Sequence, residues 1–114
     1  MLKKNCSLNM SGDKEELLIS LTGEIDHHSA VSVRTEIDEM IGQLSPKRAV
    51  LDLSNVDFMD SSGLGLIMGR YARMQAIGGK LFVRNPNERI VKIFKLAGLE
   101  KIVSIEAKEN KDEG

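Results

Sequence analysis

The sequence has few of the residues on which several classes of protein depend. Cys6 is the single cysteine, so no disulfide can form within the chain, and its place in an alternating run suits a small apolar strand residue. There is no tryptophan, and only three phenylalanines and one tyrosine could stack on single-stranded bases. Sixteen basic residues oppose seventeen acidic ones, which gives no broad attraction to nucleic acid or anionic lipid. We therefore expect neither nucleic acid nor a membrane as a partner.

Long apolar runs are missing as well. No segment approaches the ~18 apolar residues that cross a bilayer, and the lysines near the N-terminus precede no apolar stretch of the kind found in a signal peptide. With a single cysteine and no export signal, a reducing cytoplasm is the expected compartment. The 114 residues suit one domain, and an apolar fraction of 41% allows a core without metal or disulfide support.

The spacing of the apolar residues predicts alternating strands and helices. Residues 6–10 and 16–23 alternate in polarity around the turn Ser-Gly-Asp-Lys, which predicts a β-hairpin. Apolar residues every three or four positions predict helices that begin after Asp26, at Ser61 and near Pro86. Three further short apolar segments are expected to be strands, at residues 48–56, 80–84 and 101–106.

The predicted order is β-β-α-β-α-β-α-β, the pattern of a small α/β domain. Strands that alternate with helices form a largely parallel sheet, so we expect a mixed sheet of four to five strands flanked by three helices. The domain is expected to span residues 1–106. The charged tail at residues 107–114 is expected to be disordered.

Each predicted helix has residues that suit its ends and one apolar face. Asp26 is the expected N-cap of the first helix, and Gly42 and Pro46 mark its end. Pro86 suits the entry of the third helix and Gly98 its C-terminal stop. The residues expected to face the core are Leu64, Ile67, Met68, Tyr71 and Met74 in the second helix and Ile90, Phe94 and Ala97 in the third.

The sequence Asp-Ser-Ser-Gly at residues 60–63 lies where a strand ends and a helix begins. Its first three residues all suit helix capping, and capping alone is the simplest explanation of the turn. A serine hydrolase does not fit, because Met59 and Asp60 stand where the nucleophile elbow requires glycine. The adjacent His27 and His28 would point about 100° apart on a helix, the wrong spacing for two ligands on one face, so we do not expect them to share a metal ion. We expect one of the two to be partly buried and the other exposed.

Two nucleotide- or phosphate-linked alternatives also match poorly. Gly63, Gly65 and Gly69 do not form the dinucleotide fingerprint, because Met68 stands where its third glycine is required. A receiver domain would need a lysine at a later strand end, and no matching lysine occurs there. The glycines are instead expected to allow a tight turn and a close approach of the helix to the sheet or to a partner.

A surface hydroxyl that another enzyme modifies fits this turn best. A phosphoserine carries about −1.5 to −2 charges, and the free amides and dipole at a helix N-terminus stabilise such a charge. The same charge disfavours an acidic partner on a flat interface. One phosphate can therefore switch an association without moving the backbone.

Three segments resemble a known family. "TGEIDHHSA" at residues 22–30, "FMDSSGLGLIMGRY" at 58–71 and the stretch at 78–102 closely resemble the anti-sigma-F factor antagonists of spore-forming bacteria, within the STAS domain family. The resemblance covers residues 10–105. Its Asp-His-His and Gly-Arg-Tyr are typical of the sporulation branch rather than of the general-stress antagonists. It implies a single STAS domain, with the phosphorylated serine at the start of the second helix.

The resemblance implies a regulatory protein rather than an enzyme. In that family the unphosphorylated antagonist binds an anti-sigma factor, a serine kinase that uses ATP, and so frees the sporulation sigma factor. Phosphorylation releases the antagonist and a serine phosphatase restores it. We expect a monomer with no cofactor of its own. An antagonist of a general-stress kinase and a weak nucleotide hydrolase that uses the glycine-rich helix start remain as alternatives.

The resemblance also implies roles for individual residues. Ser61 matches the serine that the partner kinase phosphorylates, and Asp26 matches an aspartate near it. Ser62 is expected to be structural at the helix start, and Arg70 to be either a contact residue or a solvated charge. The partner-binding surface is then expected to comprise Asp26, Asp60, Ser62, Gly63, Gly65 and Arg70.

Overall fold

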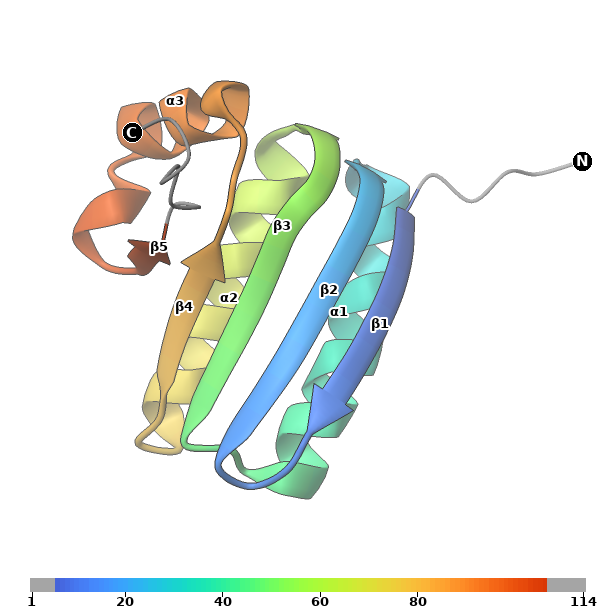
Figure 1. Ribbon diagram of the computed structural model, residues 1–114, viewed down its shortest axis with the longest axis vertical. Coiled ribbons are helices and arrows are strands. Elements are labelled where there is room, and N and C mark those ends of the chain that lie inside the picture. Colours follow the sequence, from blue (N-terminus) through green and yellow to red (C-terminus); the bar gives the residue numbers. More distant parts are fainter. Residues whose placement is uncertain (1–5, 107–114) are drawn as a thin grey trace, which may run out of the picture.

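The protein, in a computed structural model that describes residues 6–106, is a mixed five-stranded sheet whose parallel strands are joined by helices (Figure 1). The strands are β1 (Cys6–Gly12), β2 (Glu16–Ile25), β3 (Arg48–Met59), β4 (Lys80–Arg84) and β5 (Ser104–Glu106). The helices are α1 (His27–Leu44), α2 (Ser61–Ala76), α3 (Glu88–Ala97) and the 3-10 turn η1 (Leu99–Lys101). The predicted order and fold class are confirmed. The predictions for the tail at residues 107–114 lie outside the described residues.

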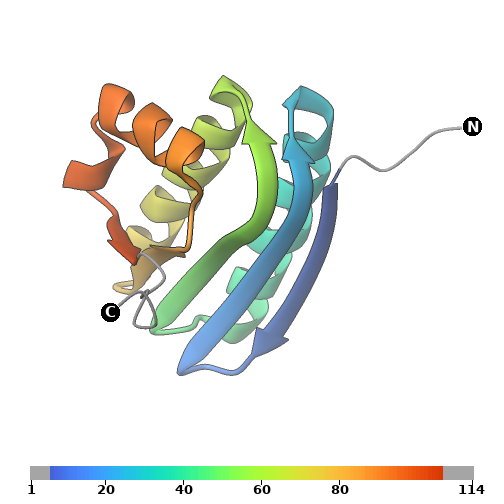
Figure 2. The same ribbon diagram turned by 45° about the horizontal axis from the view of Figure 1, so that its top comes forward.

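The sheet order is the chain order, β1-β2-β3-β4-β5. The hairpin pair β1 and β2 is antiparallel, and the three remaining pairs are parallel. Helices α1 and α2 run side by side along one face of the sheet, as Figures 1 and 2 show. Between residues 6 and 106, no helix has the length and apolarity needed to cross a bilayer.

The core lies between the sheet and the helices. Alternate residues of β2 and β3 are fully buried, as strand periodicity requires of a sheet with one face against helices. Burial of each large aliphatic side chain stabilises the fold by about 1.5–3 kcal/mol. Members of this core are Leu17, Ile19, Leu21, Ala49, Leu51 and Leu53 from the sheet and Ile37, Ile41, Ile67 and Met74 from the helices.

The helix ends are mostly those that the sequence predicts. Asp26 is the N-cap of α1 and forms a capping box with Ser29. Gly42 does not end that helix; α1 continues to Leu44, and Ser45 forms the cap in a left-handed conformation with φ of 44°, directly before Pro46. Gly98 ends α3 with φ of 73°, a conformation that costs little only for glycine.

Two of the predicted apolar faces differ from the structure. In α2, Met68 is 46% exposed, whereas Leu66 and Arg70 are buried. The reason is that α2 packs against α1 as well as against the sheet. The spacing of apolar residues in α2 does not show where α1 lies, so it does not predict which residues face α1. In α3, Ala97 is exposed, and Leu99 of η1 is buried at 1% exposure just beyond the helix.

Candidate functional site

The carboxyl ends of β2 and β3 lie next to each other and lead directly into helices. Ile25 pairs with Met59 at the end of the ladder, and the amide of Asp60 donates to the carbonyl of Ile25 at 3.2 Å. The next residue in each strand, Asp26 or Asp60, is an N-cap. Two helix N-termini, with their free amides and partial positive charges, therefore lie side by side at one edge of the sheet.

The turn before α2 presents Ser61 to solvent. Asp60 is extended, with φ of −102° and ψ of −167°, and its Oδ1 accepts a hydrogen bond from the Ser62 amide at 2.8 Å. The amide of Gly63 donates to the carbonyl of Asp60 at 2.9 Å. Ser61 is the first residue of the helix and is exposed, whereas Ser62 is half-buried. Because Asp60 performs the capping, the hydroxyl of Ser61 is not needed as the helix N-cap.

Removal of the Asp60 side chain is expected to weaken the start of α2. Asp60→Ala loses the acceptor of the 2.8 Å bond and is expected to lower the free energy of unfolding by about 1 kcal/mol. Asp60→Asn keeps an oxygen in the same place and is expected to cost less than half as much. Urea unfolding measures both values. Equal losses in the two variants would contradict a stabilising role for this hydrogen bond.

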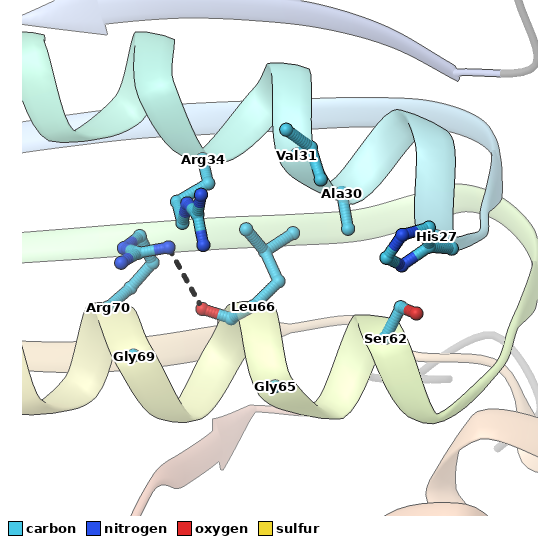
Figure 3. Close-up of a pocket in the computed structure, with 9 residues that line it drawn as sticks. All are labelled: His27, Ala30, Val31, Arg34, Ser62, Gly65, Leu66, Gly69 and Arg70. Atoms are coloured by element: carbon cyan, nitrogen blue, oxygen red, sulfur yellow. Dashed lines mark hydrogen bonds between the residues drawn. The ribbon is translucent and has the colours of Figure 1, made fainter.

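A groove of about 330 Å³ runs between α1 and α2 (Figure 3). We call it the α1–α2 groove; its lining residues are His27, Ala30, Val31 and Arg34 from α1 and Ser62, Gly65, Leu66, Gly69 and Arg70 from α2. His27 and Ser62 lie at the end of the groove where the helices begin, and Ser62 directly follows Ser61 in the chain. Arg34 and Arg70 lie at the opposite end. The groove is thus continuous with the edge that carries Ser61.

Arg70 connects the two helices. Only 6% of this residue is exposed, and its Nε lies 2.9 Å from Oδ1 of Asp38 on α1, an ion pair in which the N–H is not well directed at the oxygen. Nε of Arg73 is 3.6 Å from the same oxygen. Burial lowers the pKa of Arg70, and the charge of Asp38 opposes that shift. The alternative of a solvated charge at position 70 is therefore wrong, although its guanidinium does border the groove.

The three glycines of α2 have different surroundings. A Cβ on Gly63 would collide with the buried side chain of Met59, so close packing of α2 on β3 requires glycine here. A Cβ on Gly65 or Gly69 would meet no other atom within 4 Å. These two glycines keep the wall of the groove low instead, so only Gly63 is explained by packing inside the domain.

Two further features of this surface were not predicted correctly or at all. His27 and His28 are both exposed, and their ring centroids lie 6.0 Å apart. The expectation that one of them is partly buried is therefore wrong. Phe58, Val31 and Met68 are apolar side chains that are 45%, 46% and 46% exposed, and Val31 lines the α1–α2 groove. Apolar side chains in such positions are typical of interaction surfaces. Within residues 6–106 no group of three or more His, Cys, Asp or Glu could hold a metal ion.

Comparison with known proteins decides the family. The model of the STAS domain matches residues 7–112. The chain belongs to the STAS domain family. The anti-sigma F factor antagonist of Paenibacillus polymyxa is 39% identical to this STAS protein over 101 residues, which covers 89% of this chain and 86% of that one. The anti-sigma-B factor antagonist of Bacillus subtilis (strain 168) is 31% identical over 104 residues, covering 91% and 94%. The predicted resemblance to the sporulation branch is confirmed.

Solved structures give the same result. The anti-sigma factor antagonist SpoIIAA in its unphosphorylated form superposes on this STAS domain with a TM-score of 0.80 and 28% identity, covering 94% of this chain and 92% of that one. The phosphorylated form of SpoIIAA, described as a Bacillus cell fate determinant, gives a TM-score of 0.73 at 28% identity, covering 94% and 96%. A protein of this fold thus exists in both states.

The structure gathers most of the predicted site residues. Asp26, Asp60, Ser61 and Ser62 lie at the shared edge of β2 and β3, while Gly65 and Arg70 lie along the groove that leads away from it. Sequence reasoning missed Val31 and Arg34, which also line the groove. Both residues lie outside the apolar stripe of α1, which indicates only that they are not in the core. Every exposed residue of the helix has the same property, so the sequence does not single these two out.

Proposed function

We propose that this STAS protein is an anti-sigma factor antagonist of the sporulation branch, active when unphosphorylated and inactivated by phosphorylation of Ser61. The observation that carries the proposal is the exposed Ser61 on the first turn of α2, where two helix N-termini lie side by side. Binding to the anti-sigma factor frees the sigma factor that it holds. The relatives named as antagonists and the two states of SpoIIAA support this assignment.

The geometry explains how one phosphate can act as a switch. The added charge of about −1.5 to −2 lies at the positive end of the α2 dipole, so the domain tolerates it. A partner that covers the α1–α2 groove and the adjoining Ser61 edge in a close interface would have to desolvate that charge. A loss of 2.7 kcal/mol corresponds to about a hundredfold weaker binding, which is within the cost of one poorly paired buried charge.

The enzymes that add and remove the phosphate are part of the same proposal. The anti-sigma factor itself acts as the serine kinase and transfers the phosphoryl group from its bound ATP, and a serine phosphatase regenerates the active form. Asp26 and Asp60 fix the two helix starts that flank Ser61, so they define the surface that the kinase meets. The proposed role of the chain is that of substrate and binding partner.

A sigma-release assay tests the proposal. The cognate anti-sigma factor is loaded with its sigma factor, and the protein is added either unphosphorylated or after full phosphorylation. We expect the unphosphorylated form to release the sigma factor at near-stoichiometric amounts and the phosphorylated form to need at least about a hundredfold higher concentration. Gel filtration or fluorescence anisotropy of labelled sigma factor gives the measurement. No release by either form would refute the proposal.

A further inference from the structure

The arginine end of the α1–α2 groove carries an excess of positive charge. Arg34 is exposed, and its side chain makes no hydrogen bond or ion pair with any residue between positions 6 and 106. Arg70 lies at the same end of the groove, as Figure 3 shows. The carboxylate of Asp38 is already shared between Arg70 at 2.9 Å and Arg73 at 3.6 Å. Two guanidinium groups therefore share one carboxylate, and Arg34 adds a third positive charge close enough to act on Arg70.

The mutual repulsion of these arginines is a second sign of excess positive charge at this end of the groove. The pKa of Arg70 is lowered mainly by burial, and the charges of Arg34 and Arg73 lower it further, against the opposing effect of Asp38. A second carboxylate at this end would relieve the repulsion. A guanidinium fork also suits bidentate binding of a planar carboxylate.

The rest of the groove is apolar. Ala30, Val31 and Leu66 form its walls, and Gly65 and Gly69 leave room for another chain to approach. Arg70 follows Ser61 by nine positions, which corresponds to about 13.5 Å along α2. A partner that docks on Ser61 therefore reaches the arginine end with about four residues of extended chain.

We infer that the arginine end of the α1–α2 groove binds an aspartate or glutamate side chain of the anti-sigma factor, flanked by an apolar residue in the groove between Val31 and Leu66. The inference rests on the proposed function and names what the partner contributes. A protein segment is favoured over a free anion because the groove has apolar walls and is continuous with the Ser61 edge. The contact fixes the orientation of the docked partner.

The test compares two exposed arginines that differ in place. Arg34→Gln is expected to weaken binding of the cognate anti-sigma factor by about tenfold at low salt, with Arg34→Glu weaker still. Arg89→Gln on α3 is the matched control, because Arg89 is exposed and lies outside the α1–α2 groove; its affinity is expected to stay within about twofold of wild type. Surface plasmon resonance at two salt concentrations gives the affinities, and thermal unfolding verifies that the variants fold.

A second measurement identifies the acidic side chain. Each aspartate and glutamate of the anti-sigma factor is changed to its amide and measured against wild type and Arg34→Gln. One acidic residue is expected to lose its effect on the Arg34→Gln background, as a direct pair requires. Additive effects at every position, or equal affinities of Arg34→Gln and Arg89→Gln, would overturn the inference while leaving the proposed function intact. Failure of the wild-type protein to bind would overturn both.

Discussion

Incubation of the Ser61→Ala variant with the cognate anti-sigma kinase and ATP is expected to leave it entirely unphosphorylated, while the wild-type protein is converted to one phosphoserine per chain. Ser61 is exposed on the first turn of α2. Its hydroxyl is not the helix cap, since Asp60 accepts the bond from the Ser62 amide. Loss of the hydroxyl therefore removes the acceptor of the phosphoryl group without disturbing the fold. Phosphate-affinity gels and intact mass spectrometry measure the outcome.

Ser62→Ala is the matched control for this experiment. Ser62 is the neighbouring serine, yet it is half-buried and lines the groove instead of facing solvent. We expect Ser62→Ala to accept one phosphate at residue 61. We also expect Ser61→Ala to stay bound to the anti-sigma factor in the presence of ATP, because the switch cannot operate. A phosphate on Ser61→Ala, or its loss from Ser62→Ala, would mean that the wrong serine has been assigned.

Asp38→Ala is expected to lower the free energy of unfolding by about 2–3 kcal/mol. The change leaves the buried guanidinium of Arg70 without its carboxylate, and an uncompensated buried charge costs about 3–5 kcal/mol. The loss expected for Asp38→Ala lies at or below the lower end of this cost because the Asp38 side chain is 28% exposed. Solvent therefore screens part of its interaction with Arg70. Urea unfolding at neutral pH measures the difference.

Replacement of the arginine separates the charge effect from simple loss of contacts. Arg70→Met removes the buried charge and keeps a long apolar side chain between α1 and α2, so it is expected to cost less than Asp38→Ala. In the double variant, Asp38→Ala is then expected to add less than 1 kcal/mol, because no buried charge remains to be orphaned. An undiminished loss in the double variant would show that Asp38 stabilises the protein through contacts other than Arg70.

The strand and helix order follows from the sequence because the signals that define each element are local. The alternation in β2 and the caps at Asp26 and Gly98 are local signals that tertiary packing does not alter. The buried face of α2 is different, since it depends on where α1 lies. Sequence spacing therefore placed Met68 inside and gave no indication that Arg70 is buried.

The candidate site also has one part that the sequence predicts and another that depends on helix packing. Ser61, the two aspartates and the glycines lie in contiguous motifs, so they are visible in the sequence. The groove is not visible, because Arg34 and Arg70 come from different helices and meet only through the packing of α1 on α2. Asp38 was likewise not predicted, as its partners lie more than 30 positions further along the chain.

The glycines of α2 have a consequence for how the serine is recognised. Gly63, Gly65 and Gly69 fall within the first nine residues of the helix, and each is about 1 kcal/mol less favourable there than alanine. A free peptide of this sequence would not hold a helical shape, so the segment acquires its form only from α1 and the sheet. An enzyme that modifies Ser61 in its native geometry therefore meets a conformational epitope, which vanishes when the domain unfolds.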